Sequence, residues 1–179
     1  VKDEKLCPYY KELKPLTEAI DSADVIILTS PVYVYHCTGS MKAWLDHYGY
    51  RWMLHRPNPD MFSKQGVCIS TAAGAGMKWT NKDMADSMFF WGMGKIYRYG
   101  IAAHALNYKS ISPKKMEEIE KATDKLAEKI RRNYGHVKPG LKTKAYFEVM
   151  RKLVKSGWNE VDVAYWKEHG WTEKARPWK

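Results

Sequence analysis

Four consecutive β-favouring apolar residues, Val25 to Leu28, follow a polar turn and strongly limit what this chain can fold into. A continuous run of this kind predicts a strand that is buried on both faces, which is typical of parallel sheets. Weaker runs over residues 66–71 and 95–105 predict two further strands. The chain should therefore contain at least three strands of one sheet.

Helical patterns alternate with these strands. Thr38 and Ser112 are well placed to cap two of the helices. The expected helices cover residues 11–22, 38–49, 80–91 and 112–135, and a further apolar stripe runs over 141–153. Alternation of strands and helices predicts an α/β domain with a mostly parallel sheet. We expect this domain over residues 1–135 and a helical, Trp-rich C-terminal extension over 136–179.

Composition excludes several classes of protein. No run reaches the roughly 18 apolar residues of a membrane span, and no signal peptide is visible, so we expect no membrane association. Cys7, Cys37 and Cys68 are widely spaced and odd in number, which argues against a disulfide framework and favours a cytoplasmic location. Neither the cysteines nor the histidines show metal-binding spacings, so we predict no metal site. The net charge of +10 attracts anions but does not choose among nucleotides, nucleic acids and acidic lipids.

Two loops are the candidate ligand sites, because parallel sheets bind ligands outside the carboxyl ends of their strands. The first combines a hydroxyl, a proline and an aromatic ring that could cover a flat heterocycle; alternatively it is an ordinary turn whose aromatic packs on a helix. The second is built of small residues, which would let a flat ligand approach the backbone. Their residues are Ser30, Pro31, Val32 and Tyr33 in the first loop, and Thr71, Ala72, Ala73, Gly74, Ala75 and Gly76 in the second.

Other chemistry has less support. The glycines of the second loop lack the third glycine of a dinucleotide fingerprint, with Trp79 in its place, so a nicotinamide-binding Rossmann site is not expected. His36 beside Cys37 could suggest a base and a nucleophile, but neighbours in sequence usually point apart. The basic, Trp-rich tail could bind nucleic acid, although packing against the domain or a partner subunit is the better interpretation.

A longer pattern points to a family. The segment A-D-V-I-I-L-T-S-P-V-Y (23–33), followed by G-S-M-K-A-W-L-D (39–46), resembles the NAD(P)H-dependent FMN reductases and iron-sulfur flavoproteins of the flavodoxin-like superfamily. Residues 162–171 are also similar to C-terminal extensions of some members. The resemblance implies a three-layer α/β/α fold with strand order 2-1-3-4-5, and an FMN ring that is contacted by both loops, mostly through backbone groups.

The resemblance also implies that part of the fold lies outside these 179 residues. Family members open with a strand, a phosphate-binding loop, a helix and a second strand, which need about 30 residues, whereas only ten precede Lys11. We therefore expect the first two strands to be outside this chain, and a chain that begins at Val1 to bind FMN weakly. Cys7 resembles the last cysteine of a cluster-binding region, but one cysteine does not make a cluster.

The expected function is an FMN-dependent oxidoreductase that passes electrons from NADH or NADPH to a small acceptor such as a quinone or a flavin. No catalytic side chain is expected, because the flavin carries the chemistry. A homodimer is expected, since related proteins often build the pocket between subunits. The alternatives are a flavodoxin-type electron carrier and a basic nucleic-acid-binding or scaffold protein without cofactor.

Overall fold

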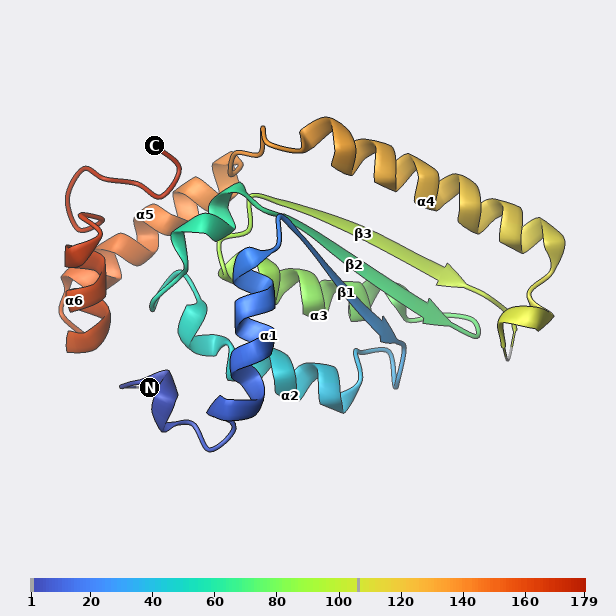
Figure 1. The fold of residues 1–179 in the computed structure, drawn as a ribbon, viewed down its shortest axis with the longest axis horizontal. Helices are drawn as coiled ribbons and strands as arrows, with labels where there is room; N and C mark the ends of the chain where they lie inside the picture. The colour runs from blue at the N-terminus through green and yellow to red at the C-terminus, as the bar shows by residue number, and fades with distance from the viewer. Residues whose placement is uncertain (1, 106) are drawn as a thin grey trace.

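A computed structural model describes residues 2–105 and 107–179 and contains a parallel three-stranded sheet (Figure 1). The strands are β1 (Val25–Pro31), β2 (Gln65–Ala72) and β3 (Lys95–Ala102), in the spatial order β1-β2-β3. Helix α2 (Gly39–His47) lies between β1 and β2 in the chain, and α3 (Met77–Phe90) lies between β2 and β3. The predicted alternation of strands and helices in an α/β fold is confirmed.

Helices cover the sheet on both faces. On one face, Leu28 and Cys68 pack with Met84 and Met88 of α3 in a core to which α1 (Tyr10–Ser22) and α2 also contribute. On the other face, α4 (Pro113–Asn133) runs along β3 (Figure 1). The side-chain amide of Gln65 donates to the carbonyl of Ile130 over 3.1 Å, and the Tyr97 hydroxyl donates to the carbonyl of Lys129 over 3.4 Å. The described chain therefore has the three layers expected from the resemblance.

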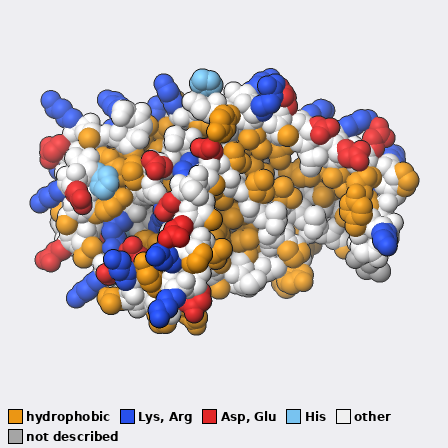
Figure 2. Space-filling model, in the orientation of Figure 1, with side chains coloured by type: hydrophobic (Ala, Val, Ile, Leu, Met, Phe, Trp, Pro, Cys, Tyr) orange, Lys and Arg blue, Asp and Glu red, His pale blue; other side chains and the backbone are white. Residues whose placement is uncertain are grey.

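The expectation that β1 is buried on both faces is wrong. Ile26 and Leu28 are buried, but Ile27 between them is 56% exposed. In the described part of the chain β1 pairs with β2 alone, and more than half of the Ile27 side chain is left uncovered there. Apolar side chains accordingly gather over the middle of the molecule in Figure 2, where Figure 1 draws the sheet, with Lys and Arg toward the rim.

Some boundaries also differ from the predicted ones. Helix α3 begins at Met77 rather than Thr80, because Gly76 acts as an N-cap through its backbone and offers no side chain that a sequence pattern could register. Strand β3 ends at Ala102 rather than Ala105, and His104 follows with a φ of +50° that no strand can continue. The expected cap at Thr38 is confirmed, since its hydroxyl accepts the Met41 N–H over 3.2 Å.

The C-terminal tryptophans belong largely to an internal cluster. Helices α5 (Leu141–Lys155) and α6 (Glu160–Glu168) surround the buried rings of Phe147, Trp166 and Trp171. Phe62, which lies just before β2, packs edge-on against Phe147 with ring centroids 5.7 Å apart. The aromatic tail thus packs against the rest of the chain, as the preferred interpretation predicted. None of the described helices is long and apolar enough to cross a membrane.

Candidate functional site

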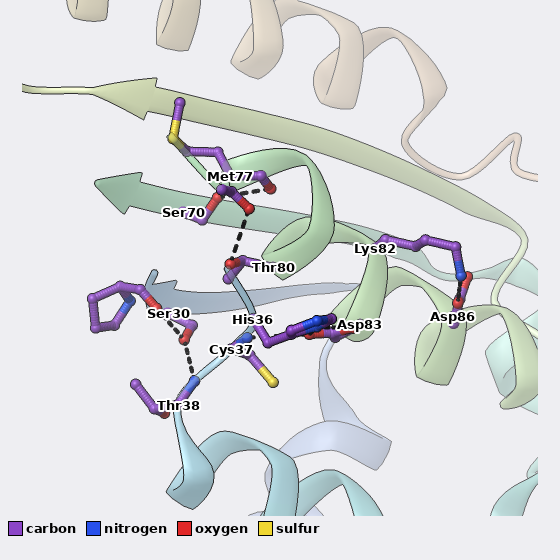
Figure 3. A network of polar contacts seen from close by, with 12 residues as sticks. Ser30, His36, Cys37, Thr38, Ser70, Met77, Thr80, Lys82, Asp83 and Asp86 are labelled. Atoms are coloured by element: carbon purple, nitrogen blue, oxygen red, sulfur yellow. Dashed lines mark hydrogen bonds and ion pairs between the residues drawn. The ribbon is translucent and has the colours of Figure 1, made fainter. Parts of the chain in front are cut away.

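The two predicted loops lie side by side at the carboxyl edge of the sheet (Figure 3). Pro31, the last residue of β1, pairs with Thr71 of β2. The N–H of Val32 then donates to the carbonyl of Thr71 over 2.9 Å and continues the pairing into the loops. Because the strands are parallel, residues 30–33 and 71–76 leave the sheet in the same direction.

Gly76 is the point where the two loops touch. Its φ of +101° strongly favours glycine. A Cβ at this position would lie 2.5 Å from Cγ1 of Val32 and 3.2 Å from the Cα of Tyr35. Both distances are too short for ordinary packing, so only glycine lets the first loop approach the start of α3 this closely.

The side chain of Ser30 has a local structural role. It is buried, and its hydroxyl accepts the N–H of Thr38 over 3.1 Å while it donates to the carbonyl of Pro31 over 2.9 Å. The hydroxyl therefore joins the two ends of the first loop and is already engaged on both sides. Because its only proton is used within the loop, the Ser30 side chain is left with one lone pair to offer a ligand, and its backbone is the other source of contacts.

Residues 33–36 form a tight hairpin that the sequence did not predict. Tyr33 and His36 exchange two backbone hydrogen bonds of 3.0 Å each. The two residues between them, Val34 and Tyr35, have φ values of +50° and +67°. Two-residue hairpins of this geometry normally contain Asn or Gly, so a β-branched residue here is a strained choice. Tyr33 is 63% exposed, so most of its side chain is not covered by the described chain.

Asp83 of α3 holds the far end of this hairpin (Figure 3). Its carboxylate accepts the backbone N–H of Cys37 over 3.1 Å and lies 3.0 Å from Nδ1 of His36. Burial, together with the nearby Asp83 carboxylate, raises the pKa of the Cys37 thiol, which opposes a nucleophilic role. Sequence reasoning missed Asp83; its only signal is that it stands seven residues, two helical turns, after Gly76.

The second loop presents main-chain groups rather than side chains. The amides of residues 73–76 donate no hydrogen bond to any residue in the described ranges. A Cβ on Gly74 would meet nothing within 4 Å, so this part of the loop faces open space. The loop also leads into the N-terminus of a 14-residue helix, where partial positive charge favours electron-rich groups.

Other features lie away from this edge. A cavity of about 310 Å³ sits at the opposite end of α2, where Tyr10, Leu13 and Tyr48 are among its lining residues, and it includes no residue of the two loops. Within the described ranges, no group of three or more His, Cys, Asp or Glu side chains could hold a metal ion. The structure thus brings the two predicted loops together at one edge of the sheet, away from this cavity.

Comparison with solved structures gives several distant similarities. The chain resembles a thermophilic tryptophan halogenase from Streptomycin violaceusniger (16% identity, TM-score 0.46, 63% of this chain and 75% of that chain). It also resembles an apo NADH:FMN oxidoreductase, EMOB, with 16% identity and a TM-score of 0.47 over 79% of this chain and 66% of that chain. A third similar structure is general stress protein 14 from Treponema denticola in complex with FMN, with 14% identity and a TM-score of 0.44 over 64% of this chain and 70% of that chain. With TM-scores below 0.5, these similarities carry no argument about this chain.

Family comparison is more decisive. The search of curated proteins gave no match. Residues 1–107 match the sequence model of the NADPH-dependent FMN reductases, and this region contains both loops, the three strands and Asp83. The match spans more than half of the chain, which therefore belongs to the NADPH-dependent FMN reductase family, a family of FMN oxidoreductases.

Proposed function

We propose that the chain binds FMN between its two facing loops and passes electrons from NADH or NADPH to a small acceptor such as a quinone or a free flavin. The observation that carries this proposal is the pairing of unengaged backbone amides, in residues 73–76, with an exposed aromatic hairpin on the adjacent strand. The isoalloxazine ring has a polar edge that accepts hydrogen bonds and a flat face that stacks on aromatic rings. The residues present therefore fit this cofactor.

The residues proposed to contact FMN are those of the two loops, Ser30 to Tyr33 and Thr71 to Gly76. Tyr33 would cover part of the ring, and the amides of 73–76 would donate to its polar edge. When bound, FMN supplies the hydride and electron chemistry. The amides and the net charge of +10 would favour negative charge at the polar edge. No side chain needs to act as an acid or a base in this proposal.

The same measurements also test two alternative functions. An electron carrier would use the same loops without reacting with NAD(P)H, although classical flavodoxins are typically acidic and this chain is basic. A nucleic-acid-binding or scaffold protein would keep the fold without cofactor. The burial of Trp166 and Trp171 within the chain removes two of the aromatic rings that such a surface would use for stacking.

The proposal includes a homodimer and a cytoplasmic location. Exposed apolar side chains on the hairpin, Tyr33, Val34 and Tyr35, would suit a subunit interface near the cofactor. Three free cysteines fit a reducing compartment. Sedimentation with and without FMN would test the dimer, and a monomer in both states would contradict it.

Titration of the full-length protein with FMN, followed by flavin fluorescence, tests the site. Tyr33→Ala should weaken binding by about 1 kcal/mol, or about fivefold, through the lost aromatic contact. Tyr10→Ala, which alters the separate cavity beside α2, serves as the matched control and should leave the affinity unchanged. Equal losses in both variants, or a loss in Tyr10→Ala alone, would place the cofactor elsewhere.

Steady-state kinetics then separate the enzyme from the carrier. We expect parallel double-reciprocal plots for NAD(P)H and a quinone, because both would use the same ring face in turn. An FMN-bound protein that leaves NAD(P)H unoxidised would support the carrier, and a protein that binds no FMN would support the scaffold.

A further inference from the structure

We propose that Asp83 is a positioning residue for the cofactor loop: it sets FMN affinity without touching FMN. This inference rests on the proposed function above. Asp83 accepts hydrogen bonds from two consecutive residues on the far side of the hairpin, the Cys37 N–H at 3.1 Å and His36 Nδ1 at 3.0 Å. One carboxylate thereby fixes both a backbone amide and a side chain of the loop.

The same helix organises both halves of the site. Gly76 at the start of α3 touches Val32 and Tyr35 of the first loop, and Asp83 two turns later holds the hairpin at His36 and Cys37. Figure 3 shows the His36 side chain directed toward Asp83 and along α3, away from the carboxyl ends of the strands. His36 is therefore placed to anchor the loop rather than to contact a ligand at the strand ends.

Backbone strain makes this anchor necessary. Val34 and Tyr35 both have positive φ values, and such conformations persist only where surrounding contacts determine them. The near end of the loop is tied to β2 by the bond from Val32 to Thr71, and the Ser30 hydroxyl holds Thr38. Without Asp83, the segment between these ties would sample other conformations, and FMN binding would have to restore the ordered one.

Neighbouring charges provide a matched control. Asp86 lies one turn further along α3 and pairs with Lys82 on the surface. Asp86→Ala removes the same charge from the same helix but leaves the hairpin untouched. His36→Asn keeps a donor near the position of Nδ1, whereas His36→Ala removes it.

FMN affinity of the full-length protein, measured by fluorescence titration, is the first readout. Asp83→Ala should weaken binding about tenfold, because it removes two hydrogen bonds to a charged group, and His36→Ala about threefold. His36→Asn should stay near the wild-type affinity, and Asp86→Ala should equal it. Should Asp83→Ala fail to fold, the comparison of His36→Ala with His36→Asn decides the question.

Hydrogen exchange of the cofactor-free protein is the second readout. The Cys37 amide should exchange faster in Asp83→Ala than in Asp86→Ala, because its acceptor is gone. If the wild-type protein binds FMN and the FMN affinities of Asp83→Ala and Asp86→Ala lie within twofold of each other, the role of Asp83 is overturned while the proposed function stands. Absence of FMN binding in the wild-type protein would overturn the proposed function and this inference with it.

Discussion

Replacing Val34 by glycine should make the protein more stable. Val34 has a φ of +50°, a conformation that costs an L-residue about 1–2 kcal/mol, and the cost is removed when the Cβ is removed. Glycine adds backbone freedom to the unfolded chain, which offsets about 0.5–1 kcal/mol of this gain. The Val34 side chain is 92% exposed, so little apolar burial is lost. The net expectation is a stabilisation of about 0.5–1 kcal/mol, or about 1–4 °C in Tm for a chain of this size.

Thermal unfolding monitored by far-UV circular dichroism would measure this shift. Val149→Gly is the matched control, because Val149 is also exposed but lies inside α5, where glycine costs a few tenths of a kcal/mol more than valine. The same substitution should therefore raise Tm at position 34 and lower it at position 149. A drop in Tm at both positions would show that the hairpin is not strained and would refute the reasoning.

Three further expectations follow from the site and the charge. Gly76→Ala should destabilise the protein by about 2 kcal/mol, because the new Cβ would crowd the Tyr35 backbone and residue 76 has an unfavourable φ for alanine. In the same unfolding assay Gly74→Ala should have a much smaller effect, since a Cβ on Gly74 would contact no atom within 4 Å. Burial raises the pKa of the Cys37 thiol and raises that of Cys68 to about 12, so both remain protonated thiols near pH 8. Iodoacetamide should therefore modify the more exposed Cys7 first, as followed by mass spectrometry. Earlier labelling of Cys37 would contradict this order. The rate of flavin reduction by NAD(P)H should fall as salt is added, because the net charge of +10 attracts the anionic nucleotide and salt screens this attraction. A salt-independent rate in stopped-flow measurements would argue against electrostatic steering of the nucleotide.

Local signals explain what could be predicted from the sequence. Thr38 and Ser112 cap helices by accepting hydrogen bonds from the backbone N–H groups of residues three positions later. Their roles can therefore be predicted from a few neighbouring residues. The position of the two loops follows from the parallel arrangement of the strands, which the apolar runs already indicated. The start of α3 was misplaced because Gly76 caps it without a side chain.

Long-range relations explain what was missed. Asp83 acts on residues 46 and 47 positions earlier in the chain, and no local pattern announces such a pairing. The hairpin was missed because Val34 and Tyr35 are poor choices for its geometry and are held there by contacts from β2 and α3. The exposed side of β1 could not be read from an apolar run, since burial depends on which elements cover each face.

The candidate site is built largely of main chain, and this has a consequence for how its importance would be detected. Alanine scanning would pass over Ala73 and Ala75 altogether, because the scan replaces side chains and the proposed contacts are amides. Proline at either position would remove the N–H itself. Many residues of such a cofactor loop can therefore be substituted while the backbone N–H donors are preserved. Sequence identity at those positions is a poor measure of whether the site has been kept.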